Sequence, residues 1–197
     1  MSTATVSADN EAVAAISAPT VVSGTFTLYM TKSYVIQALA QDIIITPANP
    51  WAHSTSGDTT ATTWQITGGD FDLRAGTGEL HLDGGIIITH LKSGQSMVLM
   101  NMRFNLATHT IDYDWKTPDG DAPVPGLDAG SGQGGVWGSS GSYTAAEVFV
   151  NKDSGAFMND FLKSTAFVDE GLFGAIATKF ELKEAAPTEG VVEWGKK

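Results

Sequence analysis

The residues best suited to chemistry in this sequence are its four histidines, which lie far apart along the chain. They are His53, His81, His90 and His109. No two of them stand four residues apart on one helix, and no HExxH pattern occurs, so no local sequence pattern predicts a zinc site. His90 follows the apolar run GIIIT, at the end of an expected strand, where it could assist a bound ligand. The alternative interpretation is an exposed histidine in a turn.

A second group of chemically useful residues is a set of aspartates. They are Asp112, Asp114, Asp119, Asp121 and Asp128. Hard oxygen ligands on a glycine-rich loop can hold calcium, which makes Asp119, Asp121 and Asp128 weak calcium candidates. The segment lacks EF-hand spacing and its terminal glutamate. Because Asp and Gly are also the usual turn formers, and Asp112 and Asp114 alternate like the solvent face of a strand, we expect turns here and no metal site.

The five tryptophans could provide flat surfaces for sugars or for a protein partner. Trp64 and Trp115 fall within alternating apolar patterns, so we expect them in the core. Trp137, in GGVWGSSG, has neighbours too small to bury it, and Trp194 stands alone in a polar tail. These two are our candidate interface residues.

No catalytic motif accompanies these residues. The sequence contains no GxSxG elbow, no P-loop and no Rossmann fingerprint. Carboxylate pairs are present, but they occur in any acidic protein, and no nucleophile is placed beside a base. We therefore expect that the protein is not an enzyme.

Composition excludes several other classes. The net charge is -11, which repels phosphate backbones, so we expect no nucleic-acid partner, and it disfavours anionic membrane surfaces for the same reason. Cysteine is absent, which excludes disulfides, thiolate zinc sites and a cysteine nucleophile. No apolar run approaches the ~18 residues of a transmembrane helix. Only 17% of residues are charged and Gly occurs 22 times, a balance typical of short strands joined by tight turns.

The two ends of the chain differ from its middle. Residues 1–20 are small, polar and aperiodic, which predicts a flexible N-terminal arm that could order on a partner. This start has neither a basic region nor an apolar core, so no secretory signal is visible in it. Residues 185–197 form a polar C-terminal tail. Between the two we expect one domain over residues 21–184.

Within that domain, apolar and polar residues alternate with the period of a β-strand. The clearest run is SMVLMNMRFNL, where Val98, Met100, Met102, Phe104 and Leu106 are expected on one face. Two short helices interrupt the strands, over SYVIQALAQ and SGAFMNDFLKSTAF, and Thr31 or Ser33 is a possible N-cap of the first.

Two segments read as loops, and the order of the elements sets the fold class. Residues 53–63 and the Gly-, Pro- and Asp-rich residues 117–142 are the expected loops. No long crossover helix separates the strands. We therefore predict an all-β, antiparallel β-sandwich or partly closed barrel with two short helices.

The succession of motifs resembles a known family. GTFTLYMTKSYVIQAL, WQITGGDFDLRAGTGELHLDGGIIITH and GQSMVLMNMRFNLATHTIDYDW are followed by VFVNKDSGAFMNDFLKSTAFVDEGLFGAIATKFEL. Over most of residues 21–183 this order is similar to exported β-rich domains of bacteria, especially actinobacteria, related to the HtaA haem-binding domains. GGIIITHLKSG corresponds to the family's histidine-bearing strand, and FLKSTAFVDEGLFGAIATKF to its closing segment.

The resemblance implies a haem ligand as well as a fold. In such domains a tyrosine near the first strand and helix holds the iron and a histidine supports it. The nearest matches here are Tyr29 or Tyr34, with His90. The family's tryptophan before the lysine is missing, since LYMTKSYV has none ahead of Lys32.

Three functions follow as hypotheses. The leading one is a non-catalytic extracellular or cell-surface module that contacts a protein partner or copies of itself and needs no cofactor. The alternative, from the resemblance, is a haem-binding module that uses Tyr34 and His90. The third is calcium-assisted carbohydrate binding by Asp119, Asp121 and Trp137.

Overall fold

The computed structural model describes residues 18–168, 171–184 and 190–194, with side chains given as far as residue 191. The expected N-terminal arm therefore lies outside the described residues except for its last three positions. The elements in chain order are β1 (Thr20–Thr31), α1 (Lys32–Ala40), β2 (Ile43–Ala48), β3 (Ala52–Ser56), β4 (Thr59–Asp72), β5 (Thr77–Leu82), β6 (Gly85–His90), β7 (Ser96–Asn105), β8 (Thr110–Thr117), β9 (Gly120–Ala129), β10 (Gly132–Trp137), β11 (Ser140–Val150), α2 (Lys152–Leu162), β12 (Leu172–Leu182) and β13 (Gly190–Trp194).

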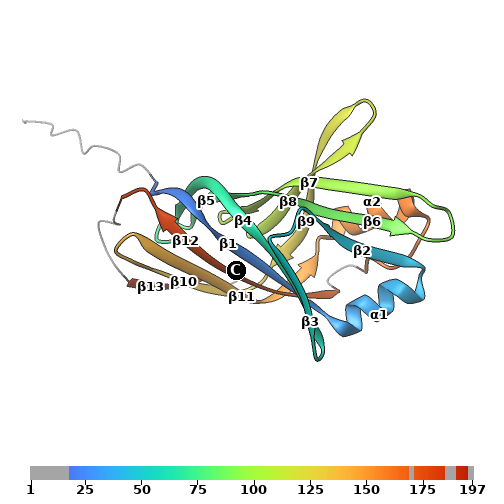
Figure 1. Cartoon of the computed structure of the whole chain (residues 1–197), viewed down its shortest axis with the longest axis horizontal. Coiled ribbons are helices and arrows are strands. Elements are labelled where there is room, and N and C mark those ends of the chain that lie inside the picture. The colour runs from blue at the N-terminus through green and yellow to red at the C-terminus, as the bar shows by residue number, and fades with distance from the viewer. Residues whose placement is uncertain (1–17, 169–170, 185–189, 195–197) are drawn as a thin grey trace, which may run out of the picture.

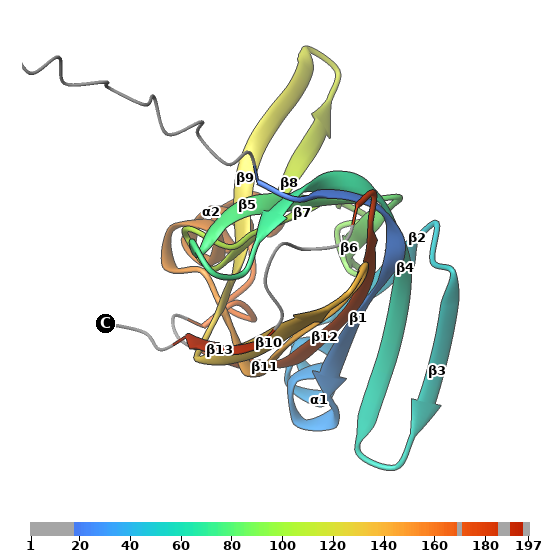
Figure 2. The same cartoon turned by 90° about the vertical axis from the view of Figure 1, so that its left-hand side faces the viewer.

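Eight of the strands form a closed antiparallel barrel. They follow one another as β12-β1-β4-β5-β7-β8-β9-β11, and β11 closes the ring by pairing with β12. The all-β class and the antiparallel pairing are thus confirmed, and the sheet is closed where a sandwich or a partly closed barrel was expected. Full closure removes the exposed strand edges that a sandwich would keep. Figure 2 shows the barrel nearly end-on, with the β3–β4 hairpin projecting from one side of it.

The outer strands attach at three places on the barrel wall. β2 pairs with β6, which pairs with β7, while β3 pairs with β4, and β10 and β13 continue outward from β11. In Figure 1, β2, α1 and the β3–β4 hairpin lie together toward one end of the molecule, and β10 and β13 lie toward the other. The end that carries α1 is where the cavity described below is found.

Aromatic rings fill the middle of the barrel. Phe71 packs against Phe104, Tyr143 and Phe180 with ring centroids 5.4–6.5 Å apart, and Phe26 lies 6.0 Å from Phe104. All five side chains are at most 1% exposed. Such ring pairs add stability beyond the apolar area they bury.

Both predicted helices are present, and polar caps start them. The Thr31 side chain accepts a hydrogen bond from the Tyr34 amide at 3.3 Å, which confirms Thr31 as the N-cap of α1. The Asn151 side chain is the N-cap of α2, because it accepts a hydrogen bond from the Ser154 amide. The α2 helix then packs Phe157 and Phe161 against Trp115 of β8, with centroids 5.1 and 5.0 Å apart.

Two expectations about loops were wrong. Residues 117–142 form the two-residue turn after β8, then β9 and β10, because antiparallel pairing satisfies the backbone of this Gly- and Pro-rich stretch. Residues 53–63 form most of the β3–β4 hairpin, whose backbone is satisfied in the same way. The C-terminal tail contains β13, which pairs with β10.

The face assignment of the strand at 96–105 was also partly wrong. The register of β7 against β8 shifts between Met100 and Arg103, around Asn101, whose φ is 51°. This irregularity reverses the alternation, so that Met97 and Leu99 are buried before it and Met102 after it. Strict alternation had placed Val98 and Met100 in the core.

Candidate functional site

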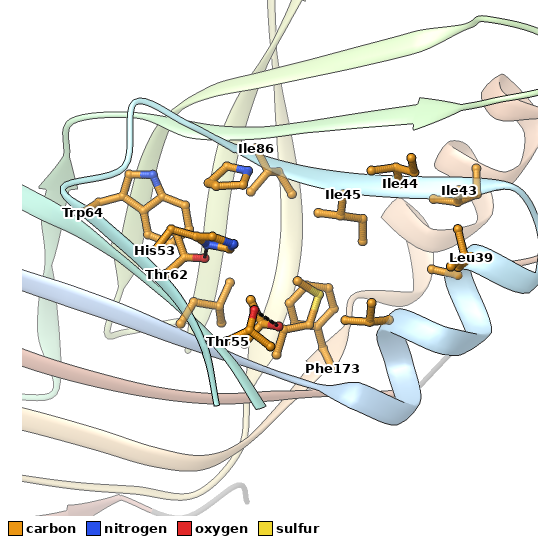
Figure 3. Close-up of a pocket in the computed structure, with 16 residues that line it drawn as sticks. Leu39, Ile43, Ile44, Ile45, His53, Thr55, Thr62, Trp64, Ile86 and Phe173 are labelled. Atoms are coloured by element: carbon orange, nitrogen blue, oxygen red, sulfur yellow. Dashed lines mark hydrogen bonds between the residues drawn. The ribbon is translucent and has the colours of Figure 1, made fainter. Parts of the chain in front are cut away.

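The main cavity lies between α1, β2 and the β3–β4 hairpin, at one end of the barrel wall. Its volume is about 340 Å³, at the lower end of the range for small-molecule sites. Figure 3 shows it as an elongated groove. We call it the groove cavity. Its lining residues are Leu28, Met30, Val35, Ala38, Leu39, Ile43, Ile44, Ile45, Pro47, His53, Thr55, Thr60, Thr62, Trp64, Ile86 and Phe173.

The floor of the groove cavity is rigid and apolar. Ile43, Trp64 and Phe173 are each at most 2% exposed. The Trp64 indole nitrogen donates to the Ala48 carbonyl oxygen at 3.0 Å, which fixes the ring against β2. Gly84 leaves room for that ring, since a Cβ there would lie 2.6 Å from Trp64 Cδ1. The floor is therefore held by the barrel core and is preorganised.

The polar side chains of the groove cavity form two pairs. Thr55 Oγ1 and Thr60 Oγ1 lie 3.4 Å apart, and Figure 3 shows Thr55 beside Phe173. His53 Nδ1 and Thr62 Oγ1 are 2.8 Å apart, on neighbouring strands β3 and β4. Figure 3 places this pair beside Trp64, and it places Leu39, Ile43 and Ile44 at the opposite end. No Asp, Glu, Lys or Arg is among the described residues that line the cavity. A ligand here would meet mostly apolar walls, with its hydrogen-bonding partners on the β3–β4 hairpin.

The hairpin that carries His53 is built by local sequence. Gly57 and Asp58 form a two-residue connection between Ser56 and Thr59, and Gly57 has φ 56°. Glycine at the first central position suits the type II′ turns that match the twist of paired strands. Because side chains alternate along a strand, His53 and Thr55 both face the groove while Ser54 faces away.

The tyrosines named by the family resemblance lie on different faces of the first strand and helix. Leu28 and Met30 line the groove cavity, so Tyr29, between them on β1, points to the other face, where it is 37% exposed. Tyr34 on α1 is 4% exposed and turns inward, with its ring 4.6 Å from that of Phe173. Burial raises the pKa of the Tyr34 hydroxyl well above its usual range, so this group is a neutral phenol.

His90 lies apart from both tyrosines. It ends β6 opposite Ile43, and its Nδ1 is 2.8 Å from Ser93 Oγ. It does not line the groove cavity. The structure therefore does not bring Tyr29, Tyr34 and His90 together around one space.

These positions decide whether the residues fit haem. Haem iron needs an axial ligand that faces the bound macrocycle. The imidazole that borders the groove cavity is His53, while the Tyr34 ring packs against Phe173 and does not line this cavity. The described side chains do not fit a haem held by Tyr34 and His90.

The calcium candidates are spread along one hairpin. Asp119 lies in the turn between β8 and β9, and Asp121 at the start of β9 forms an ion pair with Lys116. Asp128 stands seven residues further along β9, roughly 23 Å away at about 3.3 Å per residue, and accepts a hydrogen bond from Asn151 at 3.0 Å. The described residues contain no cluster of three or more His, Cys, Asp or Glu that could hold a metal ion.

The interface candidates lie on the outer strands. Trp137 ends β10 and is 51% exposed. The backbone of Trp194 pairs with Gly132 in the same outer layer. In both cartoons the β8–β9 hairpin and β10 project on opposite sides of the barrel, so Asp119 and Asp121 do not share a surface with Trp137.

The fold is similar to that of the C-terminal domain of HtaA from Corynebacterium glutamicum. The TM-score is 0.54, with 13% sequence identity, over 83% of this chain and 99% of that one. The resemblance inferred from the motifs is thus confirmed, and at this identity it concerns the fold. The sequence matches no protein-family model and no curated protein. None of the helices among the described residues is long and apolar enough to cross a membrane.

Sequence reasoning missed the groove cavity and the role of His53. A usable signal was present: Gly57-Asp58 between two Thr- and Ser-rich alternating runs predicts a hairpin with a type II′ turn. That hairpin would have placed His53 and Thr62 on facing strands. The apolar side of the cavity comes from α1 and β2, and their position against β4 could not be read from local patterns.

Proposed function

We propose that this chain is a non-catalytic, ligand-binding β-barrel domain that takes a compact, uncharged and mostly apolar molecule in the groove cavity. The observation that carries the proposal is the cavity itself, about 340 Å³ of mostly apolar space with two pairs of polar side chains on the β3–β4 hairpin. Sites for small ligands commonly combine apolar walls with a few fixed polar groups.

The charge of the protein favours an uncharged ligand. The chain carries a net charge of -11, and no lysine or arginine faces the cavity from the described residues. An anion would be repelled by the overall field and would find no cation inside. A cation would lose its hydration without gaining a carboxylate partner.

The test is a titration with N-phenyl-1-naphthylamine, an uncharged dye whose fluorescence rises in apolar sites. We expect saturable binding at one site with a dissociation constant in the micromolar range, equivalent to about -8 kcal/mol. Thr55→Trp should place an indole in the mouth of the groove and weaken binding at least about tenfold. Ser54→Trp is the matched control, because it adds the same ring to the other face of β3 and should leave binding unchanged. Equal binding by both variants, or no saturable binding, would refute the proposal.

Haemin is the second probe in the same experiment, because the sequence resembles haem-binding domains. On the geometry above we expect no Soret band to survive desalting. A retained band that Tyr34→Phe or His90→Ala abolishes would instead establish the haem-binding alternative, with a rearrangement around Phe173.

A second candidate function is contact with a protein partner, which the outer layer supports. Trp137 and Val191 are 51% and 63% exposed, on the adjacent strands β10 and β13. The pairings of β13 in the described chain are confined to β10, so its other edge could accept a further strand. We place this module outside the cell or on its surface, following the exported domains that the sequence resembles.

A further inference from the structure

The imidazole of His53, at the edge of the groove cavity, is held by the protein through one of its two nitrogens. Nδ1 lies 2.8 Å from the hydroxyl oxygen of Thr62, the residue that pairs with His53 across β3 and β4. Within the described part of the chain, Nε2 has no hydrogen-bond partner. Figure 3 shows the ring beside Trp64 and Thr62, with its second nitrogen directed away from Thr62 and into the groove.

The burial of Thr62 indicates which nitrogen of His53 carries the proton. Thr62 is 5% exposed, and among the described residues His53 Nδ1 is the one acceptor in reach of its hydroxyl. A buried hydroxyl without an acceptor is unfavourable. We therefore assign the Thr62 hydroxyl as the donor to Nδ1. Because a neutral imidazole carries one N–H, that proton lies on Nε2, and His53 presents a hydrogen-bond donor to the groove.

This donor restricts the ligands that the groove cavity can hold. His53 is exposed, so water can reach its N–H. A ligand that fills the groove displaces this water, and a pure hydrocarbon would leave the N–H without an acceptor. The second polar pair, Thr55 and Thr60, is a longer and exposed contact of 3.4 Å, so its hydroxyls can turn toward water. The need for an acceptor is therefore strongest at His53.

We propose that the groove cavity selects apolar molecules that carry an uncharged hydrogen-bond acceptor near one end, such as a ketone or an ester, and that His53 Nε2–H binds this acceptor. This inference rests on the proposed function and narrows its ligand class. The alkyl part of the ligand extends toward Leu39, Ile43 and Ile44, which Figure 3 places at the other end of the groove. A carboxylate is disfavoured, because no Lys or Arg among the described residues lines the cavity.

The experiment compares two ligands of the same shape. 2-Undecanone and 2-methyl-1-undecene differ only in C=O against C=CH₂, and each is used to displace N-phenyl-1-naphthylamine. For each protein we take the ratio of the alkene dissociation constant to the ketone dissociation constant. His53→Phe keeps a ring and removes the donor, so it should lower this ratio about fivefold, the size of one neutral hydrogen bond.

The matched control is His90→Phe. His90 forms the same kind of pair, with Nδ1 2.8 Å from Ser93 Oγ, but it does not line the groove cavity. This variant should leave the ratio unchanged. Neither histidine belongs to the buried core, so neither substitution should lower the urea midpoint of unfolding.

The assigned proton position is tested separately, in the unsubstituted protein without a ligand. A long-range ¹H–¹⁵N spectrum identifies the protonated nitrogen of each imidazole. It is recorded at about pH 8.5, above the range in which histidines ordinarily gain a proton. We expect the proton of His53 on Nε2, and a proton on Nδ1 would overturn the inference.

Three results of the displacement experiment would also overturn the inference. The first is a ratio that His53→Phe leaves unchanged although both compounds displace the dye. The second is a ratio that falls in Thr60→Val and not in His53→Phe, which would place the acceptor at the other polar pair. The third is displacement by neither compound although the dye binds. In each case dye binding that Thr55→Trp weakens would leave the proposed function standing, whereas no saturable dye binding would refute both.

Discussion

Replacing Gly84 with alanine should damage both the fold and the floor of the groove cavity. Gly84 has φ 139°, where side chains cause strain of about 2 kcal/mol. A Cβ would also lie 2.5 Å from the Ala48 oxygen and 2.6 Å from Trp64 Cδ1, and overpacking of this kind costs about 1–3 kcal/mol. We therefore expect Gly84→Ala to lower the free energy of unfolding by about 4 kcal/mol in total.

The matched control for this change is Gly57→Ala, in the β3–β4 turn. Gly57 also has a positive φ, 56°, but a Cβ there would meet nothing within 4 Å. Gly57→Ala should therefore lower the free energy of unfolding by the backbone strain alone, about 1–2 kcal/mol. Urea unfolding followed by tryptophan fluorescence measures both values. Equal losses in the two variants would refute the claim that Gly84 makes room for Trp64.

Four further substitutions concern charge, capping and the outer layer. Arg103 donates a hydrogen bond to the Asp114 carboxylate at 2.9 Å and lowers the pKa of Asp114. Asp114→Asn should therefore lower the free energy of unfolding at pH 7. The difference from the unsubstituted protein should vanish as the pH falls through the lowered pKa. Burial raises the pKa of Asp112, so Asp112→Asn should raise the free energy of unfolding at pH 7. That gain should be lost at pH values below the ordinary carboxylate range. Changes in unfolding free energy of the same sign for both Asp variants, measured by urea titration at pH 7, would contradict this pair of predictions. Thr31→Ala should cost about 1 kcal/mol of unfolding free energy by removing the α1 cap, measured in the same way. Trp137→Ser should leave the urea midpoint unchanged and reduce self-association in sedimentation velocity runs; unaltered sedimentation would argue against an interface there.

Local patterns in the sequence predicted the parts of the fold that local physics determines. The alternation around Phe26 and Leu28 marks β1, and Thr31 caps α1 as expected. The same reasoning failed at Asn101, because the register shift there depends on pairing with β8. It also failed over residues 117–142, whose strands are held by their neighbours and not by their own propensity.

The candidate site was harder to predict because its walls come from distant segments. Leu39, His53 and Phe173 meet only after the barrel has closed and β12 lies beside β1. The motif resemblance indicated the correct fold and drew attention to Tyr34. It could not show that the Tyr34 hydroxyl is buried, since that depends on how α1 packs against Phe173.

Binding of an uncharged and mostly apolar ligand in the groove cavity is tested most directly by ¹H–¹⁵N chemical-shift mapping with N-phenyl-1-naphthylamine. We expect saturable shifts confined to the amides around the groove, those of Leu39, Ile45, His53 and Phe173 among them, with none at Trp137 on the opposite end of the barrel. Shifts centred on β10, or no saturable shifts at all, would contradict the account.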